Sequence, residues 1–115
     1  MATNRNATLT TTDNFIEISI RVRQALRRTE TATRRFQRRI ESGSTVTEAF
    51  SVLGESRQFK ALTDLLSDLE HARRECRRAI AAHAKSEGVS QGELARMWGV
   101  SRQLVTRIAN ESSME

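Results

Sequence analysis

The chain contains no proline, no tyrosine, only five glycines and one tryptophan among its 115 residues. Strand-forming residues are few, and the Gly- and Pro-rich turns that separate short strands at regular spacing are missing, which argues against a β-sandwich or β-barrel. Alanine, arginine, leucine and glutamate dominate after residue 13, and these residues favour helix. The sequence therefore predicts an all-α fold.

The side chains needed for most enzymatic or metal chemistry are also scarce. Cys76 is the single cysteine, so no intramolecular disulfide forms, as in a reducing compartment. His71, Cys76 and His83 are five and seven residues apart, a spacing that does not bring three ligands to one metal ion. No apolar run reaches transmembrane length, and the N-terminus lacks the apolar core of a signal peptide. We expect a soluble cytoplasmic protein with no cofactor, no metal and no enzymatic activity.

The basic residues are unevenly distributed and are almost all arginine. The net charge is +5, with +1 in residues 1–12, +4 in 13–42, −3 in 43–70 and +3 in 71–115. Two basic segments therefore flank an acidic one, and an acidic partner such as nucleic acid is indicated. Seventeen of the nineteen basic residues are arginine, whose planar fork matches phosphate and guanine edges. A GC-rich genome gives the same bias without functional meaning, and the sequence leaves both explanations open.

The N-terminal part of the chain is expected to hold a disordered arm and then a long helix. Residues 1–12 show no apolar periodicity and are expected to be disordered. A helix is predicted to begin at residue 13 or 14, with Glu17 completing a capping box, and to end near Gly43. Its apolar positions recur mostly three or four residues apart: Phe15, Ile18, Val22, Ala25, Leu26, Thr29, Ala32, Phe36 and Ile40. Two rows of arginine accompany this stripe: Arg21, Arg28, Arg35 and Arg39, and Arg23, Arg27, Arg34 and Arg38.

An apolar seam bracketed by charge is typical of a packing helix or a coiled-coil strand, so residues 13–70 are predicted to form a helical dimerisation region. Within it, Thr45 and Glu48 predict a second capping box and a short helix that ends before Gly54. A third helix is expected from about Glu55 to Glu87, ended by Gly88. The arginine clusters at 34–39 and 73–78 fit either solvated helix faces or phosphate contacts, and the sequence does not decide between them.

The segment from Ser90 to Ile108, "SQGELARMWGVSRQLVTRI", holds the most specific pattern in the chain. Ser90 and Glu93 form a capping box that begins a helix. Ala95 is followed four residues later by Gly99, which supplies the small residue and the positive φ that two crossing helices and their turn require. Ser101 is expected to cap a second helix. Val105 and Ile108 then point inward, and the polar side chains between them point outward.

These residues resemble the helix-turn-helix DNA-binding proteins of phage repressors and bacterial transcriptional regulators. All seven structural positions of that pattern are filled, by Leu94, Ala95, Trp98, Gly99, Val100, Val105 and Ile108. The resemblance implies a tri-helical DNA-binding region at 71–115, in which helix 101–109 reads the major groove. It also implies a set of contacting residues: Gln91 on the backbone, and Ser101, Arg102, Gln103, Thr106 and Arg107 on base edges and phosphates. Two antiparallel helices that merely close a bundle account for the apolar positions but not for this outward set.

The sequence therefore predicts a homodimeric bacterial transcriptional regulator that binds double-stranded DNA and is associated with the nucleoid. No small-molecule ligand and no membrane partner are indicated. Two other functions remain open: an architectural nucleoid or plasmid-segregation protein that oligomerises on DNA, and a protein-interaction adaptor.

Overall fold

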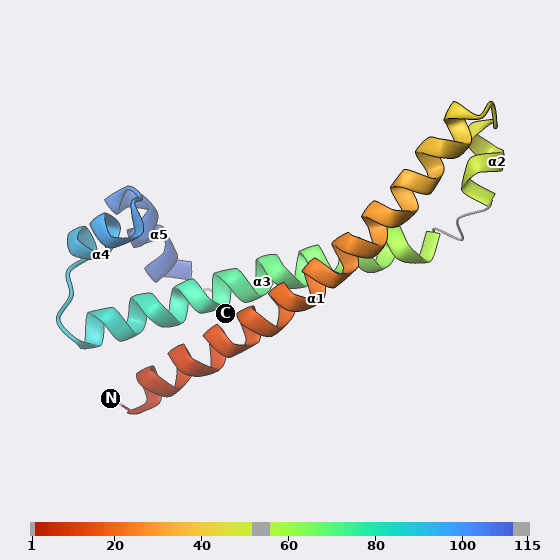
Figure 1. Cartoon of the computed structure of the whole chain (residues 1–115). Coiled ribbons are helices and arrows are strands. Elements are labelled where there is room, and N and C mark those ends of the chain that lie inside the picture. The colour runs from red at the N-terminus through yellow and green to blue at the C-terminus, as the bar shows by residue number, and fades with distance from the viewer. Residues whose placement is uncertain (1, 52–55, 112–115) are drawn as a thin grey trace. The chain divides into compact units, whose positions relative to one another are not determined.

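The computed structural model describes residues 2–51 and 56–111, and all regular structure in these ranges is helical (Figure 1). The helices are α1 (Ala2–Glu41), α2 (Val46–Ser51), α3 (Ser56–Ser86), α4 (Gln91–Trp98) and α5 (Arg102–Glu111). Since the described part of the chain contains no strand, the all-α prediction is confirmed. Contacts divide the chain into two units, one made of residues 17–69 and the other of residues up to 16 together with those from 70 onward.

The N-terminal segment is helical, and the prediction of a disordered arm at 1–12 is wrong for residues 2–12. Helix α1 begins at Ala2 rather than at residue 13 or 14. The hydroxyl of Thr8 lies 2.9 Å from Nδ1 of His83 and 3.5 Å from the carbonyl oxygen of Ala79, both in α3. Contact with α3 therefore gives this segment the tertiary support that its own composition does not supply.

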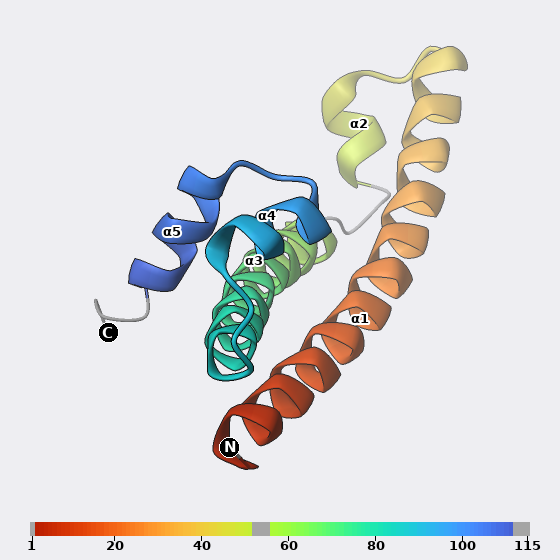
Figure 2. The ribbon, with the colours of Figure 1, turned by 90° about the vertical axis from the view of Figure 1, so that its left-hand side faces the viewer.

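Within residues 17–69, part of the predicted seam of α1 is covered by the chain itself. Val22, Ala25 and Ala32 are buried. The ring of Phe36 packs against Phe50 of α2, with 4.7 Å between ring centroids. In Figure 2, α2 lies beside the last turns of α1. These residues of the predicted seam are therefore used for packing within the chain.

The predicted connection between α1 and α2 is present. Helix α1 ends at Glu41, and Gly43 follows with φ of 100°, a left-handed conformation that favours glycine. The Thr45–Glu48 capping box is confirmed: each backbone N–H donates to the other residue's side-chain oxygen at 3.1 Å. The hydrogen bonds from Thr45 lower the pKa of the Glu48 carboxyl. Gly54, expected to end the short helix, lies outside the described residues.

Helix α3 ends at Ser86, one residue before the predicted boundary at Glu87. Gly88 takes φ of 85°, and the N–H of Val89 donates to the carbonyl of Ala84 at 3.0 Å. This pattern closes a helix C-terminus at a left-handed residue. The turn connects the end of α3 directly to the cap of α4.

Candidate nucleic-acid interface

The last turns of α3 form one apolar cluster with α4 and α5. Figure 2 shows α4 and α5 beside this end of α3. The buried members are Ala81 and Ala84 from α3, Leu94 and Ala95 from α4, and Val105 and Ile108 from α5. Val89, Trp98, Val100 and Leu104 pack against them and are partly buried. The inward positions predicted for α4 and α5 are therefore confirmed, whereas Ala81 and Ala84 were not expected as core residues.

A complete capping box fixes the start of α4. Ser90 has extended φ and ψ of −72° and 159°, and its hydroxyl oxygen accepts from the N–H of Glu93 at 3.1 Å. The Glu93 carboxylate in turn accepts from the backbone N–H of Ser90 at 3.4 Å. Two donors that the helix cannot satisfy internally are thereby paired.

We expect Ser90→Ala to lower the free energy of unfolding by about 1 kcal/mol, the usual effect of losing an N-cap side chain. Chemical denaturation followed by circular dichroism measures the change. Ser86→Ala is the matched control, because the Ser86 hydroxyl only donates to the His83 carbonyl within α3. Equal stability of the two variants would show that the Ser90 cap does not hold α4 in place.

A three-residue turn sets the direction in which α5 leaves α4. Gly99 has φ of 67° and ψ of 35°, the left-handed conformation expected for this position. The N–H of Val100 donates to the carbonyl of Ala95 at 3.0 Å. Ser101 then caps α5, because its hydroxyl oxygen accepts from the N–H of Leu104 at 3.1 Å. The turn and the cap together define which face of α5 meets the core.

The two sides of α5 differ sharply in burial. Val105 and Ile108 are each 1% exposed, while Arg102, Gln103 and Arg107 are exposed. Thr106, on the same side as these three residues, is half-buried. At about 100° per residue, the four predicted contact residues of α5 from Arg102 to Arg107 lie within an arc of about 140°. The sequence prediction did not include Asn110, which is exposed on this face one turn beyond Thr106.

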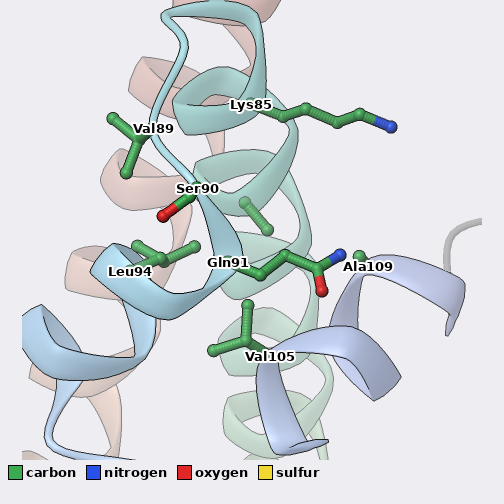
Figure 3. Close-up of a pocket in the computed structure, with 8 residues that line it drawn as sticks. Lys85, Val89, Ser90, Gln91, Leu94, Val105 and Ala109 are labelled. Atoms are coloured by element: carbon green, nitrogen blue, oxygen red, sulfur yellow. The ribbon is translucent and has the colours of Figure 1, made fainter. Parts of the chain in front are cut away.

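Gln91 joins the first turn of α4 to α5. Its Oε1 accepts a hydrogen bond of 2.7 Å from the hydroxyl of Thr106. In Figure 3 the Gln91 side chain extends from α4 toward α5, above Val105, with its amide nitrogen toward Ala109. Gln91 is thereby held next to the polar side of α5. This hydrogen bond directly joins two of the six predicted contact residues, Gln91 and Thr106.

A hollow of about 230 Å³ lies between α3, α4 and α5. Its lining is mostly apolar and consists of Ala81, Lys85, Val89, Ser90, Gln91, Leu94, Val105 and Ala109. The Lys85 side chain extends away from the apolar side chains in Figure 3. This hollow was not predicted from the sequence, since its walls come from three separate helices.

The residues considered for metal or thiol chemistry are engaged in other contacts. Nε2 of His71 lies 3.9 Å from Oε1 of Glu75, and the His83 ring contacts both Thr8 and Glu87. Burial raises the pKa of the Cys76 thiol. In residues 2–51 and 56–111, no three His, Cys, Asp or Glu side chains are placed to hold a metal ion.

None of the helices in the described ranges combines the length and the apolar character needed to cross a membrane. Comparison with protein-family models, with curated proteins and with solved structures gives no match.

Proposed function

We propose that α4 and α5 are the two motif helices of a helix-turn-helix unit in residues 71–115, with the end of α3 as the supporting helix. The protein is then a sequence-specific binder of double-stranded DNA and a transcriptional regulator. One observation carries the proposal. Helix α5 buries Val105 and Ile108 on one side and exposes Arg102, Gln103 and Arg107 on the other. Closing a helical bundle requires only the buried side.

The exposed side has the chemistry for reading base pairs. In this binding mode the first turn of the second motif helix enters the major groove deepest. Arginine pairs with guanine through two hydrogen bonds, and glutamine pairs with adenine in the same way. Arg102 and Gln103 occupy that first turn and take these roles. We assign contacts with the flanking phosphates to Gln91, which accepts a hydrogen bond from Thr106, and to Arg107.

Binding to duplex DNA should weaken steeply as salt rises. For each phosphate that a basic side chain neutralises, log affinity falls by about 0.9 for every unit rise in log salt. Titration of a fluorescent duplex at several salt concentrations measures this slope. A flat salt dependence, or no binding at low salt, would overturn the proposal and favour a protein-interaction adaptor.

We further propose that the protein acts as a homodimer. A single DNA-binding module buries only about 600–1,000 Å² of protein surface on DNA, and a dimer adds a second half-site. The seam predicted for dimerisation is partly covered within the chain, where Val22 is buried and Phe36 packs on Phe50. Helix α1 instead exposes Leu9, Ile16 and Ile20, at 48%, 55% and 40%. Their spacings of seven and four match the core positions of a coiled coil.

Replacing Ile16 and Ile20 together by glutamate should therefore give a folded monomer, because the charges prevent pairing without entering the chain's own core. Sedimentation at micromolar concentration measures the mass, and circular dichroism checks the helix content. Met97→Glu is the control, since Met97 is 67% exposed on α4. A wild-type protein that sediments as a monomer would remove the dimer from the proposal.

An architectural role on DNA remains a second candidate, favoured by the arginine-rich part of α1. The two functions differ in footprint: a regulator protects a compact site with two-fold symmetry, whereas an architectural protein protects a stretch that lengthens with protein concentration.

A further inference from the structure

The C-terminal half of α1 carries a cluster of positive charge outside the candidate interface. Between residues 27 and 39 the helix has six arginines and a single acidic residue, Glu30. All six are exposed, and we name them the arginine face: Arg27, Arg28, Arg34, Arg35, Arg38 and Arg39. At about 100° per residue they fall within an arc of about 140°. The two predicted arginine rows therefore merge on one side of α1.

This charge is not neutralised within the described chain. None of the six arginines forms a salt bridge with an acidic side chain in residues 2–51 and 56–111. Other basic residues do have such partners: Lys60 pairs with Asp64, and Arg73 with Glu70. Within the arginine face, like charges stand four residues apart, an arrangement that destabilises a helix. A bound anion relieves this repulsion.

The arginine face contains two surface hollows, each lined by three arginines. One, of about 310 Å³, is lined by Arg27, Arg28, Thr31, Ala32, Arg35 and Gln58. The other, of about 340 Å³, is lined by Arg35, Arg38, Arg39 and Ser42. Arginine binds phosphate oxygens through paired N–H groups, so both hollows suit phosphate. Arg28 and Arg35 are about 10 Å apart along the helix axis, which suits an array of phosphates better than a single one.

We propose that the arginine face binds the phosphodiester backbone of duplex DNA, as a second contact surface that does not read sequence. Duplex DNA presents one negative charge per about 1.7 Å of its axis, and the face extends over about 18 Å of helix. A membrane surface fits less well, because an interfacial helix inserts an apolar side. Here Ala32 is buried and Phe36 packs on Phe50. This surface shares its ligand with the proposed function but does not depend on α5.

The test uses the full chain with Arg28, Arg35 and Arg39 changed together to glutamine. The readout is affinity for a random-sequence duplex across a range of salt concentrations. A lysine version at the same three positions keeps the charge. A control variant removes three exposed charges outside the arginine face and the proposed helix-turn-helix unit, by Arg5→Gln, Arg57→Gln and Lys60→Gln. Circular dichroism checks that each variant is folded.

We expect the glutamine variant to bind about tenfold or more weakly and to show a salt slope smaller by about 2 to 3, near 0.9 for each phosphate that is no longer neutralised. The lysine version should recover most of the slope, and the control should stay close to wild type. An unchanged slope, an equal reduction in the control, or tighter binding to anionic phospholipid vesicles than to duplex DNA would overturn the proposal. Failure of the α5 assignment looks different, because sequence preference is then missing while the glutamine variant still binds more weakly.

Discussion

Ile108→Ala should lower the free energy of unfolding of the unit formed by residues up to 16 and from 70 onward. The expected decrease is about 2–5 kcal/mol, the range for truncating a large buried aliphatic side chain. Ile108 is 1% exposed and lies in the apolar cluster shared by α3, α4 and α5. The destabilisation combines the transfer free energy of the removed methyl groups with the cavity left between three helices. A change of this size is a large fraction of the stability of a small domain. DNA binding should fall with it, because the exposed side of α5 is positioned only while the buried side is packed.

Denaturant unfolding followed by circular dichroism, together with titration of a duplex, measures both effects. Met97→Ala is the matched control: Met97 is also a large apolar residue of this unit, but it is 67% exposed. The control should change stability by less than about 0.5 kcal/mol. If Ile108→Ala and Met97→Ala behave alike, α5 is not held by the apolar cluster.

Arg102→Ala and Gln103→Ala should each weaken discrimination at one base pair by about 1–3 kcal/mol while leaving stability nearly unchanged. Both side chains are exposed at the start of α5, where substitution removes no core packing. Removing a bidentate pair of hydrogen bonds lowers affinity for the preferred site and leaves affinity for unrelated sequences nearly unaltered. The double variant should therefore bind preferred and unrelated duplexes much more equally than wild type does.

Competition titration of the preferred site against single-base-pair variants measures this discrimination. Arg107→Ala is the informative comparison, because the loss of a phosphate contact lowers affinity evenly across sequences. If Arg102→Ala and Gln103→Ala both keep the wild-type preference, α5 is not the recognition helix. A loss of preference with Arg107→Ala alone would move base reading to the later turn.

The features of the fold that could be predicted from the sequence depend on local contacts. The capping box of Ser90 and Glu93, the left-handed Gly99 and the cap at Ser101 each involve partners within four residues along the chain. Local sequence determines such contacts, so they can be recognised without knowing the fold. The inward positions Val105 and Ile108 follow from helical periodicity in the same way.

The features that the sequence does not reveal depend on contacts between distant segments. The first twelve residues look disordered in isolation, because the partners of Thr8 are 71 and 75 residues further along the chain. Ala81 and Ala84 are not recognisable as core, since the neighbouring Ala79 and Ala82 carry the same side chain and are not buried. Helices α4 and α5 pack against the side of α3 that carries Ala81 and Ala84, where small side chains allow close approach.

The candidate site shows the same division between local and distant contacts. The outward residues of α5 can be identified from the sequence, but the hydrogen bond between Thr106 and Gln91 spans fifteen residues and two helices. The sequence also predicts that the seam of α1 meets a partner chain, although Phe36 finds Phe50 within the same chain. Periodicity shows that a face is apolar, but it does not show which surface covers that face.

Selection of bound sites from a pool of random-sequence duplex DNA by the wild-type chain tests the central claim most directly. A protein that reads the major groove with Arg102 and Gln103 should enrich a short motif containing guanine and adenine contacts, and this motif should lose definition in the Arg102→Ala/Gln103→Ala variant. A homodimer should enrich two such half-sites in inverted order. A bound pool whose base composition matches the input at every position would contradict sequence-specific DNA binding by this protein.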